Sequence, residues 1–211
     1  MNHLAGLASL RNSYFEMRHG HSKSNFARIL VGSPENAING YGLTGLGVEQ
    51  AEQSAKAMAG VLGKGTLIFS SDYARARETA EITMRIVGAK DVVLAPELRE
   101  RGFGELEKKA SPLIHEMWML DEKNPAHKTF GVESVLELQE RVTRYVRSLE
   151  REYEGRNILL VSHGDPLQVL QVSAVHIDPA FHNRIPYIKN AEIRSLEFMP
   201  SMVFDMNEEA K

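Results

Sequence analysis

Two distant segments of the chain share one local pattern, in which a short apolar run typical of a β-strand leads directly into a His-Gly pair. The segments are residues 13–17 before Arg18-His19-Gly20, and residues 157–162 before His163-Gly164. Between them, strand-like and helix-like patterns alternate. This alternation predicts an α/β fold, a three-layer sandwich with a mostly parallel central sheet and helices on both faces.

The spacing of apolar residues and helix-capping residues predicts the individual elements. Further strands are expected over 66–70, 92–94 and 194–199, and helices over 44–62, 76–87, 134–155 and 165–175. In the last helix, Asp165 either acts as the N-cap, with Pro166 at the first helical position, or orients His163. The cap is the favoured interpretation.

The length of 211 residues predicts a single domain over residues 1–211. Its least regular part is residues 105–131, which contain two prolines and the only tryptophan, with one helix expected around residues 113–120. Insertions of this kind often cover a binding site. We therefore expect this segment to form a short cap.

Composition excludes several classes of function. The 25 basic residues are outnumbered by 28 acidic ones, so no basic field is available to hold nucleic acid. The chain has no cysteine, which excludes disulfides and thiolate metal sites and suits a reducing compartment, so a cytoplasmic location is expected. The apolar runs are too short to span a membrane. The sequence does not indicate an oligomeric state.

Ligands of open parallel sheets bind at the carboxyl ends of the strands, where both His-Gly pairs fall. His19 and His163 can therefore face one pocket if their strands are neighbours. Arg18 lies beside the first histidine, and the segment after the strand over 66–70 carries Arg75 to the same edge. The planar guanidinium group of one arginine can bind two phosphate oxygens at once, so these residues indicate an anion-binding site. Taken singly, each of these residues would more often be a turn histidine or a solvated arginine than a functional residue.

His19 and His21 together raise the question of a metal site. No carboxylate or further histidine follows at ligand spacing, so no metal is expected.

Several blocks of the sequence, in order, resemble those of the histidine phosphatase superfamily, in its phosphoglycerate mutase-like branch. Residues 18–25 match R-H-G-x-S-x-x-N, and residues 43–47 resemble L-T-x-x-G. The later blocks are S-S-D-x-x-R-A from Ser70, L-x-E-R-x-F-G from Leu98, G-x-E-S from Gly131, and Ser162-His163-Gly164. The resemblance covers about residues 14–170, and several ordered blocks are far more specific than one R-H-G.

The resemblance implies a role for each matching position. His19 would be the nucleophile that accepts the phosphoryl group, Arg18, Arg75 and His163 would hold the phosphate oxygens, and Glu100 would be the general acid. Without the resemblance, a surface salt bridge would be the favoured role of Glu100. Further phosphate contacts are expected from Ser22, Asn25 and Gly164, while Thr44 either contacts the substrate or only caps its helix. The implied chemistry needs no metal and no cofactor.

The function expected from this resemblance is hydrolysis of a small phosphorylated metabolite through a phosphohistidine, without a metal. One alternative is a phosphoglycerate mutase reaction, in which the phosphoryl group returns to the substrate. Mutases of the family carry a long insertion, whereas only 26 residues separate Gly104 from Gly131 here. A second alternative is a catalytically silent phosphate-binding protein, which would not need Glu100. The segment after Gly104 lacks the family's aromatic residue and Glu-Gly, so the substrate stays open.

Overall fold

A five-stranded sheet forms the centre of the protein, whose computed structural model describes residues 1–200. The strands are β1 (Ser13–Arg18), β2 (Leu67–Ser70), β3 (Val92–Leu94), β4 (Asn157–Ser162) and β5 (Ile193–Ser195). Their order is β3-β2-β4-β1-β5, with β1 to β4 parallel and β5 antiparallel to β1. The predicted α/β fold with a mostly parallel sheet is confirmed. Residues 201–211 of the predicted domain lie outside the described part.

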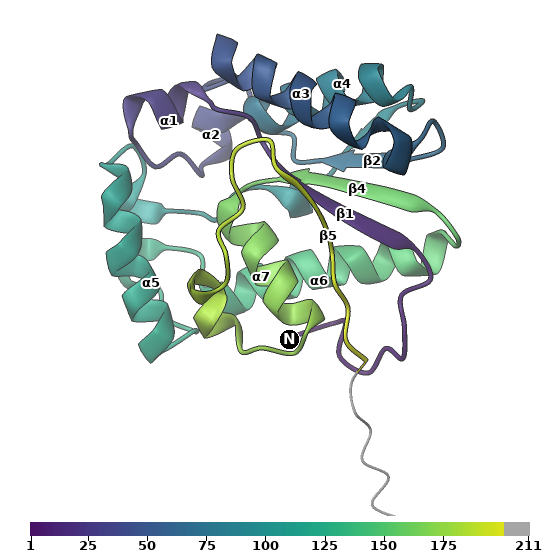
Figure 1. Cartoon of the computed structure of the whole chain (residues 1–211). Coiled ribbons are helices and arrows are strands. Elements are labelled where there is room, and N and C mark those ends of the chain that lie inside the picture. Colours follow the sequence, from purple (N-terminus) through teal and green to yellow (C-terminus); the bar gives the residue numbers. More distant parts are fainter. Residues whose placement is uncertain (201–211) are drawn as a thin grey trace, which may run out of the picture.

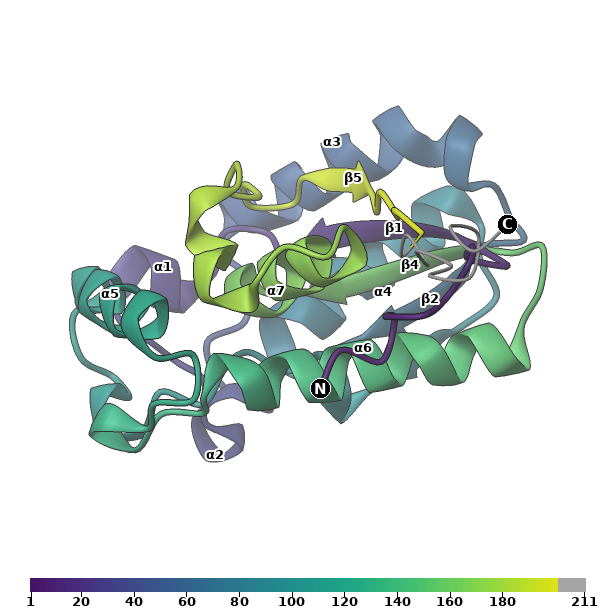
Figure 2. The same cartoon turned by 90° about the horizontal axis from the view of Figure 1, so that it is seen from below.

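Helices cover both faces of this sheet (Figure 1). On one face lie α3 (Gly45–Leu62) and α4 (Ala74–Val87), and on the other α6 (Val135–Glu152) and α7 (Gly164–Ala174). Three shorter helices, α1 (Lys23–Ala27), α2 (Pro34–Ala37) and α5 (Ile114–Lys123), gather at one end of the molecule, as Figure 2 shows. Single 3₁₀ turns complete the chain at Pro96–Leu98, Gly104–Leu106, Ser111–Leu113, Thr129–Gly131 and Pro179–Arg184.

Alternation of side chains along the strands builds two cores. In β4, Ile158 and Leu160 face α6 and α7, whereas Leu159 and Val161 face α3 and α4. All four are fully buried, as a strand of a parallel sheet covered on both faces requires. Because both faces are covered, the strand ends are left as the place where a ligand can enter.

The starts of the long helices follow from capping residues. Thr44 accepts a hydrogen bond from the Gly47 amide, and Ser134 forms a reciprocal capping box with Glu137. The predicted cap at Asp165 is wrong: α7 begins one residue earlier, at Gly164, with His163 at the N-cap position. The carboxylate of Asp165 instead accepts a hydrogen bond from Trp118 Nε1.

The predicted insertion forms a small satellite core beside the sheet. Met117 of α5 is buried together with Phe103 and Leu106, and Leu30 joins them from the segment after α1. Backbone hydrogen bonds link the two segments, from Leu30 to the Lys109 carbonyl and from the Lys108 amide to Leu30. The expected helix around residues 113–120 is present as α5. Within residues 1–200, no helix is both long and apolar enough to cross a membrane.

Candidate active site

Three parallel strands bring the predicted site residues together at their carboxyl ends. β4 lies between β1 and β2, and Arg18 is in register with Ser162, so His19 and His163 follow neighbouring strands. Their rings are 5.1 Å apart between centroids. A cavity of about 500 Å³ opens at this point, lined by Arg18, His19, Arg75 and Glu100 among others. His163 is fully buried and is not itself among the residues that line the cavity.

The hydrogen bonds of His19 define which ring nitrogen is free to react. Its Nδ1 lies 2.8 Å from the Gly20 carbonyl oxygen, which can only accept, so Nδ1 carries the proton. Arg75 Nε donates to the other nitrogen, Nε2, at 3.1 Å. Burial and the charges of Arg75 and Arg18 lower the pKa of His19 well below its ordinary value. The imidazole is therefore neutral at pH 7, with its Nε2 lone pair toward Arg75.

Three buried nitrogen atoms around His19 have no hydrogen-bond partner in the described residues. They are Arg18 Nε, Arg75 Nη1 and His163 Nδ1. Arg18 and Arg75 are otherwise fixed by backbone carbonyls, of Ile188 at 3.0 Å and of Val31 at 2.9 Å respectively. Buried donors without partners are rare and costly, and together they are suited to an anion such as a phosphoryl group.

The ring of His163 is oriented by Ser71, a residue not singled out from the sequence. His163 Nε2 lies 2.9 Å from Ser71 Oγ, which also accepts the Tyr73 amide. The hydroxyl of Ser71 can donate its proton to His163 Nε2, and in that tautomer Nδ1 carries the ring proton. Burial, with the charge of Arg75, lowers the pKa of His163 well below its ordinary value. Ser71 therefore orients a neutral imidazole whose Nδ1 has no hydrogen-bond partner among the described residues.

Glu100 lines the cavity rather than forming the surface salt bridge that its sequence neighbourhood suggests. Its Oε1 accepts the Arg101 amide at 2.9 Å. Burial, reinforced by the negative charge of Asp165 and opposed by Arg75, raises the pKa of Glu100 to about 7. A carboxyl group with this pKa is in part protonated near neutral pH and can donate a proton.

The other predicted phosphate contacts differ in how close they come to the cavity. Asn25 lines it, and its Oδ1 accepts hydrogen bonds from the Ser22 amide and hydroxyl. Ser22 is fully buried as the N-cap of α1, and Thr44 is the N-cap of α3 with its hydroxyl on the His21 carbonyl oxygen. Neither is among the residues that line the cavity.

Two glycines allow close approaches beside the histidines. A Cβ on Gly164 would lie 2.6 Å from Tyr187 Oη, and one on Gly20 would lie 2.4 Å from the Gly47 carbonyl oxygen. At Gly20 the neighbour is backbone, so no other residue fits there, whereas at Gly164 a larger residue would have to displace the end of the Tyr187 side chain. Gly164 thus lets Tyr187 reach the start of α7, and it is not among the residues that line the cavity.

Other residues at the site carried no recognised pattern in the sequence. Trp118 of α5 and Tyr187 line the cavity, and the Arg18 guanidinium lies 4.7 Å from the Tyr187 ring centroid. Asn190 Nδ2 donates to the His19 carbonyl oxygen at 3.0 Å. The position of the only tryptophan, Trp118, in the predicted insertion was the one feature of the sequence that pointed to any of these residues. Within residues 1–200, no three His, Asp or Glu side chains are grouped so that they could hold a metal ion.

Comparisons with known proteins agree with this geometry. The sequence profile of the histidine phosphatase superfamily (branch 1) matches residues 15–203. A protein from Escherichia fergusonii named Probable phosphoglycerate mutase GpmB is 34% identical over 190 residues, covering 88% of this chain and 84% of its own. The protein of the same name from Enterobacter sp. is 32% identical over 195 residues, with the same coverage.

Solved structures of low identity share the fold. A mycobacterial glucosyl-3-phosphoglycerate phosphatase in complex with VO3 superimposes with a TM-score of 0.74 at 23% identity, covering 88% of this chain and 90% of that one. An alpha-ribazole phosphatase from Shigella flexneri gives a TM-score of 0.70 at 23% identity, covering 87% and 89%. With the profile match over most of the chain, the conclusion is that this protein belongs to the histidine phosphatase superfamily, branch 1.

Proposed function

We propose that this protein hydrolyses a small phosphomonoester through a phosphohistidine at His19, without a metal. The observation that carries the proposal is the set of three buried nitrogen atoms without partners, on Arg18, Arg75 and His163, around the neutral imidazole of His19. Such a cluster suits the equatorial oxygens of a transferring phosphoryl group, whose charge grows in the transition state. Glu100 supplies the acid that a simple phosphate-binding protein would not need.

In the first step, the lone pair of His19 Nε2 attacks phosphorus as the bond from phosphorus to the ester oxygen breaks. Substrate must displace Arg75 Nε from this lone pair, so that the same guanidinium then donates to a phosphate oxygen. The leaving alkoxide takes the proton of Glu100 and departs as an alcohol.

In the second step, the ionised Glu100 takes a proton from water as the water oxygen attacks phosphorus. The bond from phosphorus to His19 Nε2 breaks, inorganic phosphate is released, and Glu100 is protonated again. His163 and Arg18 donate to the phosphate oxygens throughout. The histidine and the acid are thus regenerated in each cycle.

The test is release of phosphate from a generic aryl phosphate in the presence of a metal chelator. We expect turnover together with a phosphoenzyme that is labile to acid and stable to base. A His19→Ala variant should lose activity on the order of 10³-fold or more and form no phosphoenzyme. His176→Ala, which changes an exposed histidine, should match the wild type. Unchanged turnover in His19→Ala would rule the mechanism out.

A mutase reaction is the second candidate, favoured by the names of the relatives at 32–34% identity. It uses the same first step, after which a substrate hydroxyl rather than water accepts the phosphoryl group. Incubation with 3-phosphoglycerate distinguishes the two reactions: interconversion to 2-phosphoglycerate without phosphate release would identify a mutase.

A further inference from the structure

The cavity has two chemically different parts. Its inner end carries the charged residues Arg18, Arg75 and Glu100 with His19. Most of the rest of its lining is apolar or aromatic, such as Ile29, Leu30, Phe103, Ile114, Trp118 and Tyr187. The polar residues Ser24, Asn25, Ser111, His115 and Asn183 also line it. A volume of about 500 Å³ is typical of pockets for small organic ligands and far exceeds the space a single phosphoryl group needs. The apolar part is therefore where the leaving group of the substrate must lie.

This apolar part offers little to a charged leaving group. Among the lining residues that the structure describes, there is no lysine, and both arginines belong to the phosphate end. The remaining ionisable side chain is His115, whose Nδ1 lies 3.0 Å from the Pro112 carbonyl oxygen and whose ring stands edge-on to Trp118. A carboxylate buried here would lose its hydration and find no lysine or further arginine in the lining to offset its charge.

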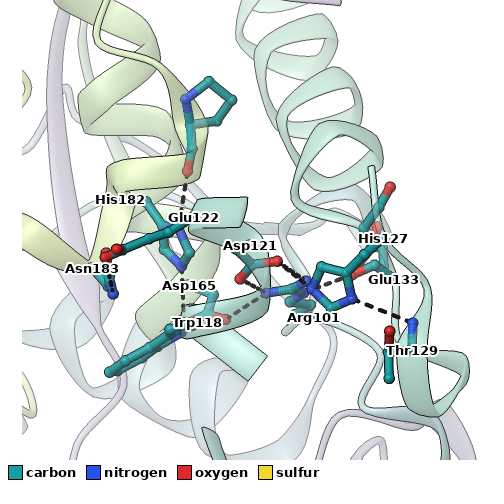
Figure 3. A network of polar contacts seen from close by, with 12 residues as sticks. Arg101, Trp118, Asp121, Glu122, His127, Thr129, Glu133, Asp165, His182 and Asn183 are labelled. Carbon is teal, nitrogen blue, oxygen red and sulfur yellow. Dashed lines mark hydrogen bonds and ion pairs between the residues drawn. The ribbon is translucent and has the colours of Figure 1, made fainter. Parts of the chain in front are cut away.

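Trp118 is held in a fixed orientation by a network of polar contacts behind the cavity (Figure 3). Its Nε1 donates to Asp165 at 3.2 Å. Arg101 Nη1 lies 3.6 Å from Asp165 and, with Nη2, binds both oxygens of Asp121 on the same helix as the tryptophan. Arg101 and Asp121 are fully buried. The indole is thus a rigid wall, with its polar edge satisfied from behind and its ring at the cavity.

We propose that the substrate is the phosphomonoester of an uncharged, apolar alcohol bearing a planar ring, and that Trp118 is the residue that selects it. The inference rests on the proposed hydrolase function. Rigid aromatic walls favour a flat ring, which can stack offset or edge-on against Trp118 and Tyr187. A small polar acid such as phosphoglycerate is too small to fill the apolar part of the cavity and too polar to be stabilised by its side chains.

The test compares three phosphates of primary alcohols: 2-phenylethyl phosphate, ethyl phosphate and 3-phosphoglycerate. Because their leaving groups are chemically similar, differences in kcat/KM report mainly differences in binding. We expect kcat/KM for 2-phenylethyl phosphate to exceed both others by about ten- to hundredfold, the gain expected from burying one phenyl ring. Trp118→Ala should lower kcat/KM for 2-phenylethyl phosphate by about tenfold and leave that for ethyl phosphate within about twofold.

Two further variants separate this role from a general effect on folding. Trp118→Phe keeps a ring and should retain most of the preference, and Met119→Ala changes an exposed neighbour on α5 and should behave as wild type. A higher kcat/KM for 3-phosphoglycerate, or an equal loss for all three substrates in Trp118→Ala, would overturn the inference while the hydrolase function stands.

A binding measurement separates failure of the inference from failure of the proposed function. Calorimetry with the His19→Ala variant reports affinity without turnover, and 2-phenylethyl phosphate should bind at least about tenfold more tightly than 3-phosphoglycerate. If wild-type protein shows this preference in binding but releases no phosphate, the hydrolase proposal fails and the assigned ligand class remains. Equal or reversed affinities would overturn the ligand class.

Discussion

His19 and Glu100 give the site opposite requirements for protons. His19 must be neutral to attack, and its pKa lies well below the ordinary value, so protonation affects it only in acid. Glu100 must be protonated to donate, and its pKa is about 7. We expect kcat/KM, which reports the free enzyme, to follow a bell with its alkaline limb near pH 7 and its acid limb well below pH 6.5. Activity that rises from pH 7 to pH 9 would contradict Glu100 as the acid.

Asp165 gives this pH profile a specific test. Its negative charge raises the pKa of Glu100, so an Asp165→Asn variant should have a lower Glu100 pKa. The alkaline limb of kcat/KM then moves to lower pH, with a severalfold loss at pH 7.5 and little change at pH 6. Asparagine keeps an oxygen that can accept from Trp118. Asp91→Asn, which changes an exposed aspartate, should leave the limb in place; an unmoved limb in Asp165→Asn would refute the coupling.

The role of Asp165 differs from the one that its local sequence pattern predicted. Asp-Pro after a strand is a sound helix-start signal, yet the helix begins at Gly164 and the carboxylate turns back toward Trp118, 47 residues away in sequence. The histidines and arginines were predictable because they follow strand ends and match family blocks. Ser71 lies in such a block too, but its contact with His163 was not predictable, and Tyr187 lies outside every block; both roles arise from contacts between segments distant in sequence.

Among the elements of the site, α5 is held in place by a buried ion pair. Asp121 binds both terminal nitrogens of Arg101, at 2.7 and 2.8 Å, and lies 2.8 Å from His127 Nε2. Glu122 adds an exposed link to Arg184. These contacts join the insertion to the rest of the domain. The Arg101–Asp121 pair therefore both positions the cavity wall and stabilises the fold.

Removal of one partner from this buried pair should therefore be costly. We expect Asp121→Ala to lower the free energy of unfolding by about 3 kcal/mol or more, because Arg101 would keep its charge in a buried place. Urea denaturation measures the loss, and hydrogen exchange should show it as faster opening of α5. Glu116→Ala, on the exposed face of the same helix, should change stability by less than about 0.5 kcal/mol. A similar small change in Asp121→Ala would show that the pair is not an anchor.

The elements themselves were predicted with uneven success, for physical reasons. The long amphipathic helices α3, α4 and α6 and the strands between them are where capping and periodicity indicated. The short helices α1 and α2 were not predicted, because helices of 5 and 4 residues carry too little periodicity. The last strand is shorter than the predicted 194–199 and pairs antiparallel at the sheet edge, over Ile193–Ser195.

For the whole molecule, the alternating pattern was sufficient to predict the layers, since each strand had to be covered on both faces. It could not show that β1 and β4 are neighbours, which depends on the crossover of the whole chain. It also gave no indication of Glu16, a carboxyl group fully buried in β1. Glu16 Oε2 accepts from Gln171 at 2.7 Å, and burial raises its pKa to about 8.

Glu16 should make the stability of the whole protein depend on pH. Its pKa is higher in the folded state than the ordinary 4.5, so the folded state holds this proton more tightly. The contribution of Glu16 to the free energy of unfolding is then greatest below about pH 4.5 and falls as the pH rises toward 8. A Glu16→Gln variant resembles the protonated carboxyl group at every pH and should escape this loss.

Urea denaturation of wild type and Glu16→Gln at several pH values between 4.5 and 8.5 measures the effect. The variant's advantage should be near zero at pH 4.5 and grow to a few kcal/mol at pH 8, at about 1.4 kcal/mol for each unit by which the pKa is raised. Glu100, whose pKa is also raised, acts in the same direction in both proteins and cancels from the difference. Glu105→Gln, on the surface, should show no such growth. An advantage constant with pH would mean that Glu16 ionises in the folded protein as readily as in the unfolded chain.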